Sequence, residues 1–340
     1  MPVDLPPECI ELESLSRIAR EQGTVEDLAV VEVDSIRLPI TSVLLGCSDP
    51  RAPLFIVVGG VHGLERIGAR VVLSYLRTVL ESFAWDETLR RKLEHTRLLF
   101  VPVVNPGGIA LRQRSNPNGV DLMRNAPIPD SGGATPLIGG HRLSPALPWF
   151  RGGVPGQVEV ETQALIDVVE RHAFTCPTVV AIDVHSGFGF RDRLWFPYAH
   201  TRVPIDHLAE VGRIAELFDV THPEHFYRIE PQAQAYTISG DVWDYLYDGY
   251  RDAQPEGSFV PLTLEMGSWQ WVKKNPRQLI SRVGPFNPQM PHREQRIRRR
   301  HFTLFDFLWR CVASPRAWAE RSAEQRAEAR WRAFDRWYAR

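Results

Sequence analysis

Four mainly apolar runs, each followed by a turn, constrain the fold of this chain more than any other feature. The runs cover residues 54–58, 98–104, 178–184 and 259–264. Their length and lack of alternation are typical of strands buried on both faces of a sheet. An amphipathic helix from about Ile67 separates the first two runs, and such a strand–helix–strand unit implies parallel strands. The sequence therefore predicts an α/β fold.

Histidine and glutamate residues stand where three of these runs end. His62 and Glu65 follow the first run, His185 follows the third and Glu265 follows the fourth. Open α/β sheets bind ligands at the carboxyl ends of their strands, so we expect these side chains to converge. Two histidines and one carboxylate are a ligand set for catalytic zinc, and a second carboxylate remains as a general base. Bound zinc lowers the pKa of water to about 7, which suits a hydrolase.

A long polar stretch, residues 112–156, separates the second run from the next helix and is rich in Gly, Pro and Asn. Loops of this length inside a compact domain are usually functional or disordered. This one contains Arg112, Arg114 and Arg124. An arginine can bind a substrate carboxylate or polarise a carbonyl group. We therefore expect this stretch to contribute to a substrate site.

The chain shows no internal repeat and no clear linker, which predicts one catalytic domain, residues 1–312, and a C-terminal amphipathic helix, residues 313–340. Ser314 and Pro315 are a helix start signal. Four apolar side chains then follow at helical spacing: Ala327, Trp331, Phe334 and Tyr338. We expect this stripe to pack on the domain or on a second subunit.

Composition and charge argue against several other classes of protein. The formal net charge is −1, so the basic run 293–301 is expected to be a solvated helix face and not a nucleic-acid site. No apolar run approaches the roughly 18 residues of a membrane span. The N-terminal residues lack the apolar segment of a secretory signal, which predicts a cytoplasmic location. The four cysteines have no C-x-x-C spacing, which argues against a disulfide framework and a cysteine zinc site.

Five motifs in this chain resemble, in order, those of the zinc metallocarboxypeptidases related to pancreatic carboxypeptidase A. They span residues 54–270 and read GGVHGLE, VNPGG, NGVDLMRN, DVHS and TLEMG. The chain looks like a divergent, bacterial-type member of this family. The resemblance implies a single α/β/α domain around a mixed, twisted eight-stranded sheet, and a zinc-dependent hydrolase that removes a residue from the C-terminus of a peptide.

The resemblance also implies roles for the residues at the strand ends. His62, Glu65 and His185 look like the ligands of one zinc ion per chain. Glu265 looks like the general base and acid. Asp121 resembles an aspartate that orients the first zinc histidine, a partner that metal sites commonly have.

Further residues resemble the family's substrate-binding groups. Arg114 is similar to the arginine that polarises the scissile carbonyl and stabilises the oxyanion. Arg124 is similar to the arginine that binds the terminal carboxylate of the substrate. Tyr236 stands four residues before Gly240, as does the family tyrosine that closes over the substrate.

The chain departs from the family pattern at several positions. Met123 stands where the family has an asparagine beside Arg124, so half of the expected carboxylate clamp is missing. Either Arg112 or Asn125 supplies another donor, or the enzyme accepts substrates whose C-terminus is blocked or differently placed, and the second alternative is slightly favoured. Leu64 replaces an arginine found in many relatives. Counting without a gap from Gly240 places Trp243 where relatives have the residue that reads the C-terminal side chain, which predicts a smaller or closed pocket.

Three functions remain open on the sequence alone. The first is a zinc carboxypeptidase or a close peptidase, which Arg114, Arg124 and Tyr236 favour. The second is an amidohydrolase of the aspartoacylase and succinylglutamate desuccinylase type, which acts on acylated amino acids. The third is a binding protein that keeps the fold without turnover. The substrate is accordingly a peptide or an acylated amino acid, and the sequence predicts no nucleic-acid partner, no membrane partner and no particular oligomeric state.

Overall fold

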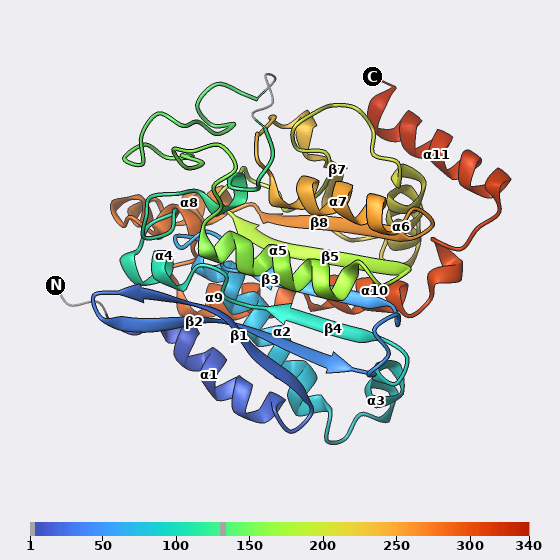
Figure 1. Ribbon diagram of the computed structural model, residues 1–340, viewed down its shortest axis with the longest axis horizontal. Coiled ribbons are helices and arrows are strands. Elements are labelled where there is room, and N and C mark those ends of the chain that lie inside the picture. The colour runs from blue at the N-terminus through green and yellow to red at the C-terminus, as the bar shows by residue number, and fades with distance from the viewer. Residues whose placement is uncertain (1–3, 130–133, 340) are drawn as a thin grey trace.

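A single eight-stranded sheet forms the centre of the computed structural model, which describes residues 4–129 and 134–339 (Figure 1). The strands follow the order β1-β2-β4-β3-β5-β8-β6-β7. Their bounds are β1 (Gly23–Val33), β2 (Ile36–Gly46), β3 (Leu54–Gly59), β4 (Arg97–Val101), β5 (Thr178–Ser186), β6 (Arg193–Phe196), β7 (Arg228–Pro231) and β8 (Ser258–Met266).

The sheet is mixed, as the resemblance implied. The central strands β4, β3, β5 and β8 run parallel to one another, whereas β1, β2 and β4 pair antiparallel and β6 pairs antiparallel with β8. The parallel register places His185 on β5 directly opposite Glu265 on β8. The two strand ends that carry candidate catalytic residues are therefore neighbours. The predicted α/β fold with a mixed eight-stranded sheet is confirmed.

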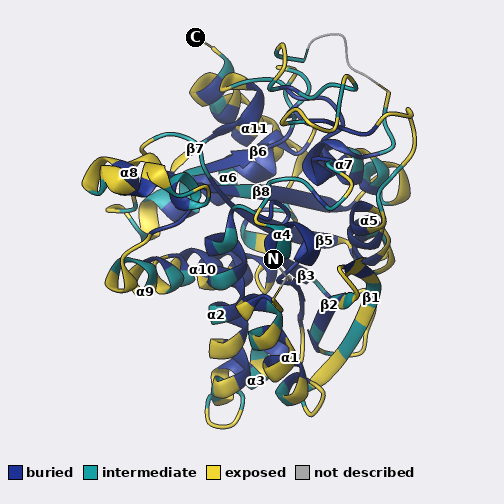
Figure 2. Cartoon of the chain, turned by 90° about the vertical axis from the view of Figure 1, so that its left-hand side faces the viewer, coloured by how far each residue is buried: buried dark blue, intermediate teal, exposed yellow. Residues whose placement is uncertain are grey.

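Helices cover both faces of this sheet. Figure 2 shows α5 and α7 on one side, and α1, α2, α9 and α10 on the other. The helix bounds are α1 (Pro7–Ala19), α2 (Arg66–Ser82), α3 (Glu87–Leu93), α4 (Pro106–Leu111), α5 (Val160–Ala173), α6 (Leu208–Thr221), α7 (Val242–Ala253), α8 (Trp269–Lys274), α9 (Pro291–Arg300), α10 (Phe302–Val312) and α11 (Ala323–Tyr338). Of the helices in the described residues, none has the length and hydropathy needed to cross a lipid bilayer.

Close packing of α2 against β5 fixes the turn that carries His62 and Glu65. Every residue of β3 and β5 is buried, as their apolar runs predicted. A Cβ atom on Gly68, in the first turn of α2, would lie 2.2 Å from the backbone oxygen of Val184. Only glycine allows the helix to come this near. The start of α2 is thereby held against the end of β5, where His185 lies.

The C-terminal helix packs through a different face from the one that its apolar stripe predicted. Trp331 is 68% exposed and Phe334 is 46% exposed, whereas Ala329, Ala333 and Trp337 are buried. Gly212 of α6 leaves room for Ala333, because a Cβ at Gly212 would lie 2.7 Å from that of Ala333. Small residues therefore set the contact between α11 and α6.

Candidate metal centre and active-site cavity

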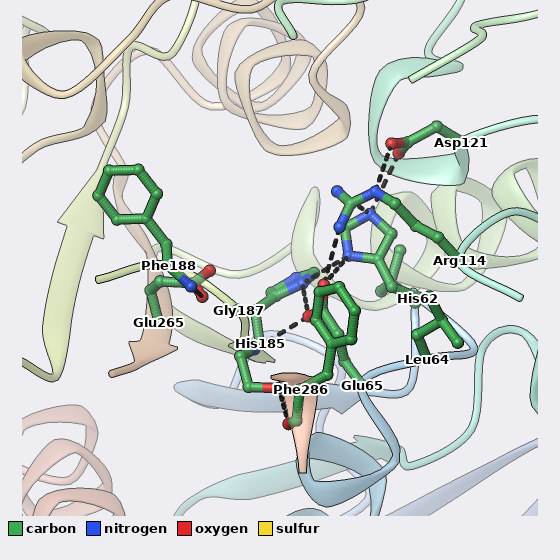
Figure 3. A network of polar contacts seen from close by, with 12 residues as sticks. His62, Leu64, Glu65, Arg114, Asp121, His185, Gly187, Phe188, Glu265 and Phe286 are labelled. Carbon is green, nitrogen blue, oxygen red and sulfur yellow. Dashed lines mark hydrogen bonds and ion pairs between the residues drawn. The ribbon is translucent and has the colours of Figure 1, made fainter. Parts of the chain in front are cut away.

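His62, Glu65 and His185 converge at the carboxyl ends of β3 and β5 (Figure 3). The Nδ1 atom of His62 lies 3.0 Å from Glu65 Oε1, and the Nδ1 atom of His185 lies 3.2 Å from Glu65 Oε2. The two Nδ1 atoms lie 3.2 Å apart. All three side chains are buried. Three ligand atoms that face one point, out of bulk water, form a candidate metal centre.

The outer nitrogen of each imidazole faces an aspartate. His62 Nε2 lies 3.1 Å from Asp121 Oδ1, and His185 Nε2 lies 2.9 Å from Asp183 Oδ2. Both aspartates are fully buried. Carboxylates in this position orient the imidazole of a metal-binding histidine and make it a better ligand. With Nε2 directed to a carboxylate, each Nδ1 is left free to bind an ion, so the donor set fits zinc.

Arg114 ties the candidate ligands to the arginine-containing loop. Its Nε donates to Asp121 Oδ2 over 2.9 Å, its Nη1 donates to Glu65 Oε1 over 2.9 Å, and its Nη2 lies 2.9 Å from His62 Nε2. Burial alone would raise the pKa of Asp121, but Arg114, Arg124 and His62 hold it well below its usual range. Asp121 therefore remains a carboxylate and can support His62 across the physiological pH range.

Glu265 lies beside the three converging ligands and not among them (Figure 3). Its Oε1 accepts a hydrogen bond from the backbone N–H of Phe188 over 2.9 Å. Burial, followed by the nearby Glu65 carboxylate, raises the pKa of Glu265 to about 8. A carboxyl group whose pKa lies near neutrality can both accept and return a proton, as a general base and acid must.

A cavity of about 450 Å³ opens over this centre, a size typical of small-molecule sites. Of the sequence-predicted substrate residues, Arg114, Met123, Arg124 and Tyr236 line it. Tyr236 packs against Phe188 and Trp195 with ring centroids 5.6 Å and 5.9 Å away. Four residues that lie up to 122 positions apart in the chain are thus brought to one surface.

Arg112 does not line this cavity. It caps the C-terminal end of α4 in a left-handed conformation, with φ of 53°, and its side chain is exposed. This backbone turn separates the direction of Arg112 from that of Arg114, although the two are close in sequence. The expected substrate-binding role of Arg112 therefore has no support from its position.

Trp243 also lies outside the cavity, in contrast to the position expected from ungapped counting. Its indole is 2% exposed and faces the sheet, where Nε1 donates to Asp183 Oδ2 over 2.9 Å. Asp241 caps α7 by accepting hydrogen bonds from the backbone N–H groups of Trp243 and Asp244. The helix that begins there turns Trp243 away from the cavity and toward the aspartate that faces His185.

This contact predicts a loss of zinc affinity in Trp243→Phe. The phenyl ring keeps most of the buried apolar volume but removes the donor to Asp183, which then constrains His185 less well. Changes to such outer partners typically weaken metal binding by about 10- to 100-fold. Competition with a chromophoric chelator measures the affinity. Unchanged affinity in a folded variant would mean that Trp243 plays no part in positioning His185.

Two residues of this region were not foreseen from the sequence. Asp241 lines the cavity and is 2% exposed, and its helix-capping position after Gly240 is a signal that could have identified its place. Asn287 accepts a hydrogen bond from Ile67 N and donates one to Leu64 O. It braces the turn between His62 and α2, but it lies more than 200 residues further along the chain, so no local pattern identifies it.

Comparisons with known proteins agree with this geometry. Residues 28–270, more than half of the chain, match the family model described as zinc carboxypeptidase. A stretch of 75 residues is 33% identical to carboxypeptidase SOL1 of Arabidopsis thaliana and covers 22% of this chain and 15% of that protein. A stretch of 163 residues is 30% identical to the carboxypeptidase N catalytic chain of Rattus norvegicus and covers 42% of this chain and 33% of that protein. The chain thus matches a third or less of the length of these relatives.

Solved structures share the fold. Thrombin activatable fibrinolysis inhibitor superposes with a TM-score of 0.66 at 19% identity, over 89% of this chain and 71% of that chain. Carboxypeptidase A from Helicoverpa armigera gives a TM-score of 0.63 at 18% identity, over 91% of this chain and 72% of that chain. With the family match over residues 28–270, the fold and the motifs lead to one conclusion. The chain belongs to the zinc carboxypeptidase family.

Proposed function

We propose that this protein is a zinc-dependent hydrolase that cleaves a peptide bond near the C-terminus of a peptide and binds one zinc ion per chain. The observation that supports this most is the convergence, in a single cavity, of His62, Glu65 and His185 with Glu265 and Arg114. The family match over residues 28–270 supports the same reaction. A zinc ion held there would act as a Lewis acid and lower the pKa of water. The water would then lose a proton more readily and become a better nucleophile at neutral pH.

Glu265 is the proposed proton carrier. Its carboxylate would take the proton of the attacking water and deliver it to the leaving amine, a role that requires it to reach the cavity without being a metal ligand. Both conditions are met, since Glu265 lines the cavity and lies outside the converging set. A nearby divalent cation favours the ionised carboxylate, which offsets the effect of burial on its pKa.

Arg114 is the proposed group that polarises the scissile carbonyl. A guanidinium has five N–H donors. Arg114 gives one to Asp121 and one to Glu65, and N–H groups remain on both terminal nitrogens. A fixed cation that lines the cavity stabilises a developing oxyanion without having to reorganise. Its partners Glu65 and Asp121 hold it in place.

Arg124 and Tyr236 are the proposed contacts to the terminal carboxylate. Arg124 is 2% exposed and donates to Ile138 O and to Asp121 Oδ2, and its two remaining N–H groups are available for a ligand. Burial raises the pKa of Tyr236, so its hydroxyl remains protonated at neutral pH and can donate a hydrogen bond. The pair could hold one end of a peptide.

A substrate panel tests this proposal. Blocked dipeptides with a free C-terminal carboxylate, the same dipeptides as amides, and N-acyl amino acids should be compared with and without a chelator. We expect chelator-sensitive hydrolysis of the peptides. Exclusive hydrolysis of N-acyl amino acids would instead favour the aspartoacylase type, and no hydrolysis by zinc-loaded protein would favour a binding protein. The family match favours neither alternative.

Met123 should limit the preference for a free carboxylate. It lines the cavity beside Arg124 and is 6% exposed, and a thioether has no N–H to donate. Met123→Asn supplies an amide donor, and a hydrogen bond to a charged group is worth about 1.5–3 kcal/mol. The ratio of kcat/KM for free-acid over amidated substrates should rise by roughly 10- to 150-fold.

Met123→Leu is the matched control, because it keeps an apolar side chain and adds no donor. Its substrate ratio should equal that of the natural chain. If Met123→Asn also leaves the ratio unchanged, position 123 does not face the substrate carboxylate.

A further inference from the structure

A second cavity, of about 770 Å³, lies on the side of the molecule where α8, α9 and β7 meet (Figure 2). Its walls come from residues 190–192, residues 225–229, α8, α9 and the end of α11, and it shares no lining residue with the active-site cavity. We call it the basic cavity, because its lining contains seven arginine and lysine side chains against one carboxylate. The whole chain has a net charge of −1, so this positive charge is a local feature.

Carboxylates neutralise three of the seven cations. The ion pairs join Arg228 to Glu230, Arg300 to Asp192 and Arg336 to Asp219. Asp192, the carboxylate in the lining, is 8% exposed, and its Oδ1 accepts a hydrogen bond from Gly267 N. Its Oδ2 has no hydrogen-bond partner in the described chain and lies 3.5 Å from Arg300 Nη2, so the charge of this carboxylate is set against one of the paired cations.

The other four cations have no such partner. Arg191, Lys274, Arg293 and Arg296 make neither an ion pair nor a side-chain hydrogen bond within residues 4–129 and 134–339. Four like charges around one hollow repel one another. They come from two separate parts of the fold, the loop after β5 and the segment from α8 to α9, so the hollow is not a single solvated helix face.

Arg293 gives independent evidence of a missing partner. Its Nη1 is shielded from solvent and has no hydrogen-bond partner in the described chain. Buried donors nearly always have one. Since Arg293 lines the basic cavity, an anion bound there could provide the acceptor that the protein does not.

We propose that the basic cavity binds a small molecule that carries a chain of phosphate groups. Arginine forks match phosphate oxygens in geometry. The terminal phosphate of a chain brings about −1.5 to −2 charges and each internal phosphate about −1, so three phosphates roughly balance the four unpaired cations. The volume lies within the usual range for small-molecule sites. Phe190 lines the cavity and is 54% exposed, and it offers a flat surface to a heterocycle attached to the phosphates. The ring of Phe226 is already covered by the guanidinium of Arg300, 3.6 Å from its centroid.

Calorimetric titration of the intact zinc-loaded protein tests this site without measuring hydrolysis, so it is independent of the proposed peptidase activity. The probes are inorganic tripolyphosphate, ATP, adenosine and a single-stranded oligonucleotide. Tripolyphosphate and ATP should bind at submillimolar concentration, more weakly as salt is added, and adenosine should not. Tighter binding of ATP than of tripolyphosphate identifies a nucleotide as the natural source, and equal binding identifies the phosphate chain alone.

The variants are Arg293→Gln and Arg296→Gln, with Arg299→Gln as the control. Arg299 is on the same helix but lines a different surface hollow, with residues of α1 and α2. Each of the first two should weaken tripolyphosphate binding by roughly tenfold or more, and the control should not. Any removal of zinc by the probe would affect all three variants equally, so it cannot explain a difference in binding between them. The exposed Arg296 provides a test even if Arg293→Gln does not fold.

Three results would overturn the proposal. These are no binding at millimolar tripolyphosphate, equal weakening by Arg296→Gln and Arg299→Gln, or tighter binding of the oligonucleotide than of either polyphosphate. The last would indicate a nucleic-acid surface in place of a small-molecule site.

Discussion

Glu265→Gln is expected to lower kcat for peptide hydrolysis by roughly 100- to 10,000-fold while the protein keeps its zinc. Glutamine has nearly the same shape, and its amide oxygen can still accept the hydrogen bond from Phe188 N, but it cannot take a proton from water. Zinc should stay because Glu265 is not among the three converging ligands. Steady-state kinetics and metal analysis of the same preparation measure both properties.

Glu256→Gln is the matched control for this change. Glu256 is exposed and lies just before β8, the strand that carries Glu265. Its loss should leave kcat and zinc content unchanged. A zinc-loaded Glu265→Gln variant with near-normal kcat would exclude Glu265 as the proton carrier. Loss of zinc together with activity would instead place Glu265 in the metal centre.

The second large effect is expected for His185→Ala, which should abolish both zinc binding and hydrolysis. The substitution removes one of three ligands and leaves Glu65 and Asp183 without their contacts to the imidazole. Two remaining protein ligands are too few for a catalytic zinc site, which normally has three. Zinc per chain by elemental analysis, with circular dichroism to establish folding, measures the result.

His222→Ala is the control for that variant. His222 lies at the end of α6 and is not among the three converging ligands. The His222→Ala protein should keep one zinc per chain and full activity. A folded His185→Ala protein that still holds one zinc per chain would contradict the ligand assignment.

The central part of the fold could be predicted from the sequence because its strands are buried on both faces. The four apolar runs correspond to β3, β4, β5 and β8, which form the middle of the sheet. The sequence between residues 190 and 258 shows no regular pattern, although the structure places β6, α6, β7 and α7 there. The strands β6 and β7 have four residues each, which is too short for a periodic pattern to appear.

The metal-ligand candidates could be predicted because they directly follow strands whose ends are neighbours in the sheet. The direction of the Trp243 side chain could not be predicted, because it depends on how α7 is rotated about its axis. The cap at Asp241 sets that rotation. The direction of Arg112 could not be predicted for a similar reason, because its own left-handed backbone conformation turns the side chain outward. In α11 the apolar stripe was misleading, because contact with Gly212 favours Ala333 over larger side chains.

The most direct test of the account is to follow zinc content and peptide hydrolysis together through chelation and reconstitution. The purified protein should hold one zinc per chain and shorten a free-acid peptide from its C-terminus, as seen by mass spectrometry. Chelation should remove both the metal and the activity, and added zinc should restore them in proportion. Hydrolysis that persists in protein shown to be free of metal, or no C-terminal shortening by fully zinc-loaded protein, would contradict the account.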